Sequence, residues 1–302
     1  MINNRINTLV SKFKEYNIDG YIIPKNDEFF SEYSANDRLK TITNFSGSAG
    51  YSIILKNKNY LFVDGRYTIQ AKKEVGKNFQ IIDYHKIINC NLFKNLSIGF
   101  DPKFFTSIQI KKFFFRNNQV KSIESNLIDQ IHKNKFKSNK PFFSLDNKAV
   151  GENYKTKITK IRKYLKKNKS DYLFITAPEN VAWLLNIRGH DNPNSPIPNC
   201  HLIIDNKNSF YLIANKNKVS RLIREKKLKS YQIIEPKNFI EFISNLKGKK
   251  IIIDKNTCSI FFENLIKKKF KILKKEDPVY NLKSVKNKVE IKNMIKCHVA
   301  DG

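Results

Sequence analysis

The sequence contains no apolar run that approaches the ~20 residues of a membrane-spanning helix. Its first ten residues, MINNRINTLV, lack the apolar core of a secretory signal peptide. Only four cysteines occur, and none of them forms a CxxC pair. They are Cys90, Cys200, Cys258 and Cys297. Scattered thiols fit a reducing compartment better than a disulfide framework, so these absences predict a cytoplasmic protein without a membrane partner.

Signatures of common hydrolases are also missing. There is no Gly-x-Ser-x-Gly nucleophile elbow and no His-Glu-x-x-His zinc helix. The histidines are His85, His132, His190, His201 and His298. The first four have no second histidine or carboxylate at ligand spacing, and His298 with Glu290 and Asp301 cannot form two metal sites. The two histidines that directly follow a cysteine would point away from it on a strand or helix. We therefore expect all five to be non-ligands, and we assign neither catalytic nor metal-binding residues.

Acidic residues are scarce beside basic ones, because 57 Lys and Arg face 27 Asp and Glu and the formal net charge is +30. Such a charge permits weak, salt-sensitive adhesion to polyanions. Lys, Asn, Ile, Phe and Tyr are over-used together, which indicates AT-rich codons, and the lysines are interleaved through the whole chain. Lysine also outnumbers arginine, whereas base readout favours arginine forks. We therefore expect no specific nucleic-acid partner.

What the chain does contain is an internal repeat of about 152 residues. An amphipathic helical pattern begins each half. Its matched positions are Ile2 and Tyr154, Ile6 and Ile158, Leu9 and Ile161, Phe13 and Leu165. Each pattern leads into an Asp and an apolar strand, at 19–23 and 171–175. Two short apolar runs around an Asn-rich turn then predict a hairpin in each half, at 52–63 and 201–213.

Later segments match as well. Residues 79–82 and 231–234 differ only in their first aromatic residue, and residues 98–101 and 251–254 both end in Asp. A Thr-led helix, from Thr106 or Thr257, is expected after each. Each half thus reads helix, strand, hairpin, helix, strand, helix, strand, helix.

A hairpin combined with strands joined through helices predicts an α/β fold with a mixed sheet flanked by helices. The alternative is two unrelated α/β domains with chance similarity. We place one domain at 1–136, a related domain at 150–284 and a separate helical segment at 285–302. Residues 136–149, where Lys, Asn, Ser and Pro cluster, form the boundary.

Three segments differ from an ordinary core pattern. Residues 44–50 (Asn-Phe-Ser-Gly-Ser-Ala-Gly) form a small-residue turn before a strand. A structural turn is favoured there, because no Lys-Ser/Thr follows as in a phosphate loop. In residues 63–67 (Val-Asp-Gly-Arg-Tyr), Asp64 stands where a helix cap belongs. Arg66 either pairs with a local carboxylate or projects from the helix start to bind an anionic group.

The third segment, residues 181–189 (Val-Ala-Trp-Leu-Leu-Asn-Ile-Arg-Gly), holds the only tryptophan. We expect a helix that ends at Arg188 and Gly189, with Ala182, Trp183 and Leu185 in the core. The Pro-rich loop that follows must then lie on the surface, where it could cover a partner domain.

Together these segments resemble the aminopeptidase P family (Xaa-Pro aminopeptidases) of the creatinase superfamily. The resemblance keeps its order along nearly the whole chain. It rests on residues 31–33 (Ser-Glu-Tyr), 45–50, 64–67 with 70–71, 182–189 and 282–294, followed by His298 and Asp301-Gly302. By this resemblance, residues 285–302 look like the start of the first helix of the family's catalytic domain. His190 is a departure, because a small polar residue is usual there, and this puts the geometry of the loop in doubt.

The resemblance implies two tandem creatinase-N-like (ribonuclease H-like) domains, followed in the family by a catalytic domain of pita-bread fold. That domain is a hydrolase and metallopeptidase that holds two manganese ions on two Asp, one His and two Glu. It releases the residue before a proline at the second position of short peptides, and it can form homodimers.

No such ligand set can be placed in these 302 residues. We therefore expect a fragment that lacks the catalytic domain, binds no Mn²⁺ and is inactive alone, while shaping the entrance and pocket of the active site. Arg66 is the residue we expect to bind substrate. The alternative function is a stand-alone binding or interaction module that has lost the enzyme domain.

Overall fold

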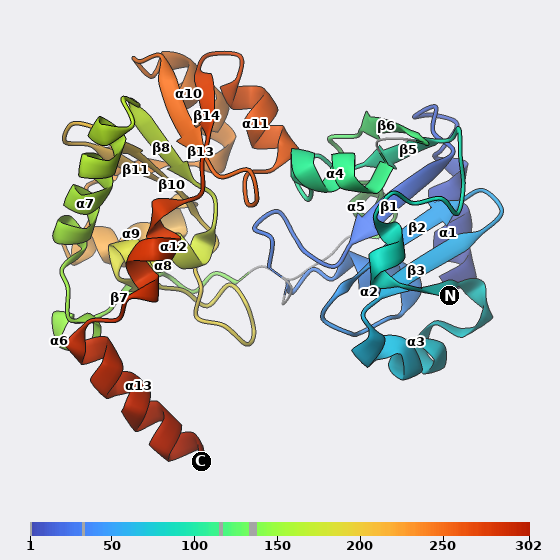
Figure 1. Cartoon of the computed structure of the whole chain (residues 1–302), viewed down its shortest axis with the longest axis horizontal. Helices are drawn as coiled ribbons and strands as arrows, with labels where there is room; N and C mark the ends of the chain where they lie inside the picture. The colour runs from blue at the N-terminus through green and yellow to red at the C-terminus, as the bar shows by residue number, and fades with distance from the viewer. Residues whose placement is uncertain (1, 32–33, 115–116, 133–137) are drawn as a thin grey trace. The chain divides into compact units, whose positions relative to one another are not determined.

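The computed structural model describes residues 2–31, 34–114, 117–132 and 138–302, and the chain divides into two compact units (Figure 1). Unit 1 is Met1–Phe136 with Ser259–Phe261, and unit 2 is Lys137–Cys258 with Phe262–Gly302. The family-domain limits expected from the sequence, 1–136 and 150–284, stay a prediction.

Unit 1 is a six-stranded sheet with helices on both faces. Its strands are β1 (Gly20–Pro24), β2 (Gly50–Leu55), β3 (Asn59–Val63), β4 (Gln80–Asp83), β5 (Ser97–Phe100) and β6 (Gln119–Ser122). Its helices are α1 (Ile2–Ser11), α2 (Arg38–Thr43), α3 (Thr68–Val75), α4 (Ser107–Phe114) and α5 (Leu127–Ile131). The strand order is β4-β3-β2-β1-β5-β6, with β1, β2 and β3 antiparallel and the other pairs parallel.

Unit 2 repeats this sheet. Its strands are β8 (Tyr172–Ile175), β10 (His201–Asp205), β11 (Phe210–Ile213), β12 (Ile233–Ile234), β13 (Lys250–Ile253) and β14 (Lys271–Lys274), in the order β12-β11-β10-β8-β13-β14. A separate pair is β7 (Phe143–Ser144) and β9 (Ile187–Arg188). The helices are α6 (Asn147–Val150), α7 (Tyr154–Lys167), α8 (Pro178–Leu185), α9 (Lys216–Arg224), α10 (Phe239–Asn245), α11 (Ile260–Ile266), α12 (Pro278–Ser284) and α13 (Lys288–Asp301).

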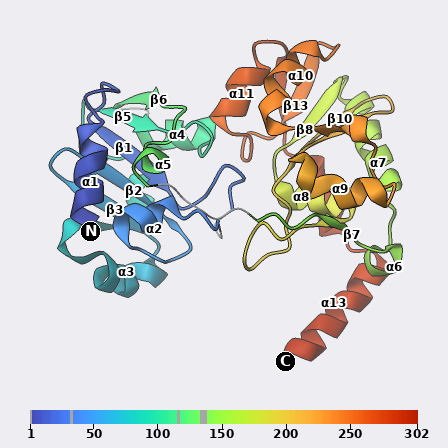
Figure 2. The ribbon, with the colours of Figure 1, turned by 180° about the vertical axis from the view of Figure 1, so that it is seen from behind.

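Position by position, the two strand orders are the same, which confirms the α/β class with a mixed sheet flanked by helices. In unit 1, α1, α2, α3 and α5 pack on one face of the sheet and α4 on the other. In unit 2, α7, α8, α9 and α12 share one apolar cluster, while α10 and α11 share another (Figures 1 and 2). Because both faces are covered, the central strands read as continuous apolar runs.

Several details differ from the sequence-based expectation, and α2, α5 and the β7–β9 pair are additions to it. The segment after β4 forms a short 3₁₀ helix, Tyr84–Ile87, and an irregular loop instead of an α-helix. Asn89 and Asn95 adopt positive φ there (51° and 58°), a conformation that breaks helices. β6 and β14 were missed because they are short edge strands: the residues of β6 are all exposed, and β14 holds only two apolar residues between exposed lysines. α8 ends at Leu185, and Arg188 lies in β9.

A polar joint between a strand end and a helix start occurs in both units. In unit 1, Asn126 caps α5 and its Nδ2 donates to Asp101 Oδ2, just after β5, at 3.0 Å. In unit 2, Asp277 caps α12 and its backbone N–H donates to Asp254 Oδ2, just after β13, at 2.9 Å. The duplication therefore extends to a buried hydrogen bond that fixes the end of each sheet.

Replacing Asn126 with Ala should destabilise unit 1 by about 2–4 kcal/mol. The substitution removes the cap of α5 and also leaves the buried Asp101 carboxyl with one donor fewer. The exposed Asn153 caps α7 through a single bond, so Asn153→Ala should cost about 1 kcal/mol. Urea unfolding followed by circular dichroism measures the free energy of unfolding of both variants. Equal losses would contradict a stabilising role for the Asn126–Asp101 hydrogen bond.

His201 is buried at the start of β10. Its ring lies 4.9 Å from that of Phe262 and 5.9 Å from that of Phe174 (centroid to centroid), and Nδ1 is 3.1 Å from the Thr176 carbonyl oxygen. Burial lowers the pKa of His201 to about 4, against the opposing effect of the Thr176 hydrogen bond. The imidazole is therefore neutral at pH 7.

This burial predicts an acid-sensitive unit 2. An unfolded chain protonates His201 near pH 6.5 and the folded chain only near 4, so the unfolded state binds more protons between these values and stability falls as pH falls. At about 1.4 kcal/mol per pKa unit, His201 should account for about 3 kcal/mol over this window.

Denaturation of the parent and of His201→Gln at pH 7 and pH 4.5 measures the effect. The stability difference between them should shrink on acidification, because the substitution removes the group whose pKa is lowered in the folded chain. A parallel profile for His201→Gln would refute the prediction.

Candidate functional site

Arg66 projects from a short 3₁₀ helix, Gly65–Tyr67, that follows β3. Asp64 caps this helix, and its Oδ1 accepts from both the backbone N–H and Nε of Arg66 at 2.9 Å. The side-chain hydrogen bond from Arg66 and, to a smaller extent, the bond from its backbone N–H hold the pKa of Asp64 below its usual value. The Arg66 side chain is 75% exposed, so the local pairing orients the guanidinium while leaving it open to solvent.

The small-residue segment 44–50 packs beside Tyr67, the residue that follows Arg66. A Cβ on Gly47 would lie 2.2 Å from the Phe45 ring, and one on Gly50 would lie 2.9 Å from the Phe62 carbonyl oxygen, so close approach explains both glycines. The Ser48 hydroxyl is 2.8 Å from the hydroxyl of Tyr67. The structure thus brings two of the sequence motifs together and gives residues 44–50 the expected structural role.

The motif at 181–189 lies in unit 2, where it surrounds a buried lysine. Lys157 Nζ donates to the Trp183 carbonyl oxygen at 2.9 Å and to Asn186 Oδ1 at 2.8 Å, and it lies 3.8 Å from the Trp183 ring centroid. Burial lowers the pKa of Lys157 to about 8, although Glu290 opposes this shift. The Trp183 indole N–H donates to Glu290 Oε1 at 2.9 Å.

Of the motif at 31–33, Glu32 and Tyr33 lie outside the described residues.

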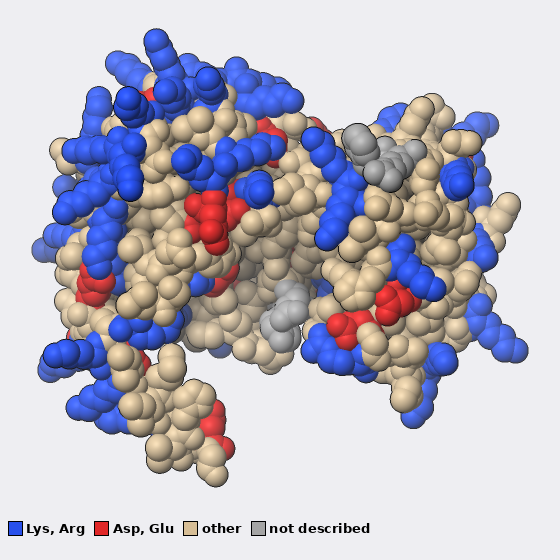
Figure 3. Space-filling model, viewed as in Figure 1, with Lys and Arg blue, Asp and Glu red and all other residues tan. Residues whose placement is uncertain are grey.

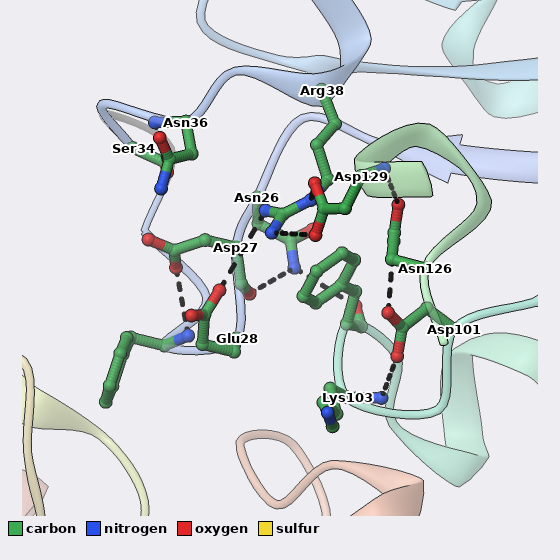
Figure 4. A network of polar contacts seen from close by, with 12 residues as sticks. Asn26, Asp27, Glu28, Ser34, Asn36, Arg38, Asp101, Lys103, Asn126 and Asp129 are labelled. Carbon is green, nitrogen blue, oxygen red and sulfur yellow. Dashed lines mark hydrogen bonds and ion pairs between the residues drawn. The ribbon is translucent and has the colours of Figure 1, made fainter. Parts of the chain in front are cut away.

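A second candidate site, which the sequence analysis missed, is a hollow of about 600 Å³ in unit 1 (Figure 4). It lies where the parallel strands β1, β5 and β6 end, and the loops after them carry polar side chains. Ligands of open α/β sheets bind at such carboxyl ends. The lining residues are Glu28, Arg38, Asp101, Lys103, Phe104, Glu124, Ser125, Asn126, Asp129 and Gln130.

Arg38, at the start of α2, is the central cation of this hollow. Its Nε and Nη2 donate to the two carboxylate oxygens of Asp129 on α5 at 2.8 and 2.7 Å. The Phe104 ring centroid is 4.6 Å from Cζ, and the side chain is only 9% exposed. Burial tends to lower the pKa of Arg38, but the bonds and charge of Asp129 outweigh it and raise that pKa.

Two carboxyl groups of the network are unusually easy to protonate. Burial raises the pKa of Asp101 to about 6, despite its bonds from the Lys103 backbone N–H and from Asn126. Burial and the nearby Glu28 raise the pKa of Asp27 to about 6 as well. Asp27 Oδ1 accepts from the backbone N–H groups of Phe29 and Ser31, so this carboxyl holds the loop after β1 in place.

The sequence did carry a signal for this hollow. Asn26, Asp27 and Glu28 follow one predicted strand and Asp101 ends another. Polar residues directly after parallel strands meet at one edge of a sheet. The pairing of Arg38 with Asp129 has no such signal, since it joins residues 91 positions apart.

Metal-ligating groups do not gather in the part of the chain that the structure describes. No group of three or more His, Cys, Asp or Glu side chains there could hold a metal ion. The two divalent ions implied by the family resemblance therefore find no ligand set among the described residues. The described chain also has no helix long and apolar enough to cross a membrane.

Basic side chains are not confined to one element. Lys and Arg cover much of the face seen in Figure 3, and Asp and Glu form small groups among them. The carboxyl-rich lining of the hollow therefore contrasts with a chain of formal net charge +30.

Comparison with known proteins finds relatives that match this chain along nearly its whole length. "Probable Xaa-Pro aminopeptidase P" of Coprinopsis cinerea is 27% identical over 322 residues, covering 96% of this chain and 51% of that protein. "Xaa-Pro aminopeptidase 1" of Dictyostelium discoideum is 27% identical over 327 residues, covering 100% and 52%. The chain thus spans about half the length of the curated relatives it matches.

Among solved structures, X-prolyl aminopeptidase from Caenorhabditis elegans, described as a cytosolic enzyme with a di-nuclear active site, matches with a TM-score of 0.83. The match covers 97% of this chain and 53% of that one at 23% identity, and it shows a shared fold. Family models described as "Creatinase/Prolidase N-terminal domain" match residues 5–130 and residues 132–290. The chain therefore belongs to the creatinase/prolidase N-terminal domain family and carries two such domains in tandem.

Proposed function

We propose that this chain forms the N-terminal, non-catalytic part of a metal-dependent Xaa-Pro aminopeptidase, which releases the residue before a proline at the second position of short peptides. One observation carries the proposal. Two family domains follow each other in the chain, and relatives named Xaa-Pro aminopeptidase match over nearly all of it. In this function the two units shape the entrance and the substrate pocket.

In this proposal the 302 residues do not catalyse hydrolysis alone. The described residues offer no cluster of metal ligands, whereas a relative of the same fold is described as having a di-nuclear active site. The metal ions, which we propose to be manganese, would then be held by parts of the enzyme that these residues do not include. The whole enzyme is proposed to be cytoplasmic and able to form a homodimer.

Arg66 is the residue that we propose to contact substrate. Its guanidinium is exposed, always charged and oriented by Asp64. Such a group can donate charge-assisted hydrogen bonds to a peptide carbonyl or carboxylate. Because the Asp64 bonds set its direction before binding, little side-chain entropy is lost when a peptide arrives.

A stand-alone binding module remains the second candidate. One feature weighs against it: α13 exposes a row of apolar side chains, including Ile291, Met294, Ile295 and Val299. Exposed apolar patches of this kind mark interaction surfaces or promote aggregation, so a module that evolved to stand alone should have lost or capped this face.

Hydrolysis of an Xaa-Pro dipeptide with added Mn²⁺ tests the proposed function. The 302-residue chain should be silent, and a version extended through the downstream reading frame should be active. Activity of the 302-residue chain itself would overturn the proposal, and silence of a folded, Mn²⁺-loaded extension would favour the binding module.

In the extended enzyme, Arg66→Ala should lower kcat/KM about 10–100-fold, the loss of one to two charge-assisted bonds to substrate. Arg66→Lys should retain part of the activity because it keeps the charge without the fork. Arg224→Ala, which removes an exposed arginine from α9, serves as the matched control and should change nothing. Unchanged kcat/KM in a folded Arg66→Ala enzyme would exclude the role.

A further inference from the structure

The hollow of unit 1 contains a buried cationic donor whose hydrogen bonds are incomplete. Arg38 uses Nε and Nη2 for Asp129, but its buried Nη1 has no hydrogen-bond acceptor within the described part of the chain. The nearest ion-pair contact of Nη1 is Glu28 Oε2 at 3.9 Å, beyond hydrogen-bond range. Leaving a buried charged donor unsatisfied is unfavourable, so this position suits an incoming acceptor oxygen.

Carboxyl groups outnumber cations around that donor. Glu28, Asp101, Glu124 and Asp129 line the hollow, against Arg38 and Lys103. Asp129 is occupied by Arg38. The Glu28 side chain is 47% exposed, and each carboxylate oxygen of Asp101 accepts one hydrogen bond from the described residues. A carboxylate oxygen accepts two or more bonds, so Glu28 can still receive an ammonium, while Asp101 adds negative charge to the lining. A ligand with only negative charge would be repelled by these carboxylates, and a ligand with only positive charge would be repelled by Arg38.

Unit 2 shows how the duplicated joint is completed internally. There Asn180 of α8 donates to Asp277 Oδ2 at 2.7 Å, and the Lys283 ammonium of α12 donates to Asn180 Oδ1 at 2.6 Å. Lys283 follows the cap Asp277 by six positions, and the residue six positions after Asn126 is His132, which does not line the hollow. The ammonium that unit 2 supplies from its own chain thus has no counterpart among the lining residues of α5.

We propose that this hollow binds a small zwitterion of the free α-amino-acid class, with its carboxylate on Arg38 Nη1 and its ammonium on Glu28, whose Oε2 lies 3.9 Å from Nη1. The opposite charges of such a ligand match the donor and the carboxylates at once. The volume of about 600 Å³ lies in the range of small-molecule sites, ~300–1,000 Å³, and the polar lining suits a polar ligand. The inference concerns binding by unit 1 and stands apart from the proposed hydrolysis.

Isothermal titration of the 302-residue chain with L-alanine and L-leucine at pH 7.5 and low ionic strength tests the site. N-acetyl-L-alanine lacks the ammonium, and L-alanine amide lacks the carboxylate. We expect saturable binding of at least one free amino acid and at least about 10-fold weaker binding of both analogues, the loss of one charged partner. No saturable binding of the free amino acids, or equal binding of either analogue, would overturn the proposal.

Two substitutions locate the binding. Glu28→Gln keeps the shape of a half-exposed side chain and should weaken binding about 10-fold, while Glu241→Gln, an exposed glutamate of α10, should leave it unchanged. Arg38→Lys should abolish binding if circular dichroism shows it folded, and otherwise Glu28→Gln decides alone. Undiminished binding to Glu28→Gln would place the ligand elsewhere and refute the site.

Discussion

In both sheets the first strand is paired on one side with a hairpin and on the other with a parallel strand that comes about 75 residues later in the chain. β1 pairs β2 antiparallel and β5 parallel, and β8 pairs β10 and β13 in the same way. This parallel pairing brings the end of the first strand beside the end of the fifth, where Asp101 or Asp254 stands. The capping joints, the hollow and the positions of α5 and α12 all depend on it.

The same constraint has led to different chemistry in the two units. Unit 2 closes its joint with an amide, a carboxyl and a lysine from its own helices, so this end of the sheet is a structural contact. In unit 1, Arg38 pairs instead with Asp129 of the neighbouring helix α5, and a polar hollow remains beside this pair. A duplicated framework therefore carries one copy that holds itself together and another that can take up a small polar molecule.

Much of the fold could be predicted from the sequence because the repeat supplies two readings of the same pattern. The helices that open each half, the hairpins and the mixed sheets follow from apolar periodicity that burial on both faces enforces. The edge strands β6 and β14 could not be found in this way, because each has only four residues and neither carries a buried apolar run. The segment between β4 and β5 was misread because single asparagines at positive φ leave no periodic trace. At the site, Arg66 and its partner Asp64 are close in sequence and were visible, whereas Arg38 and Asp129 meet only through the tertiary fold.

The single tryptophan has a further consequence. Trp183 lies in unit 2, with a lysine ammonium over its ring and its indole N–H bonded to Glu290 of α13. Tryptophan emission of the whole chain therefore originates from unit 2 alone and responds to the attachment of α13. Unfolding of unit 1 is invisible in that signal and must be followed through its tyrosines or its backbone. The chain thus carries an intrinsic optical label that separates the melting of one repeat from that of the other.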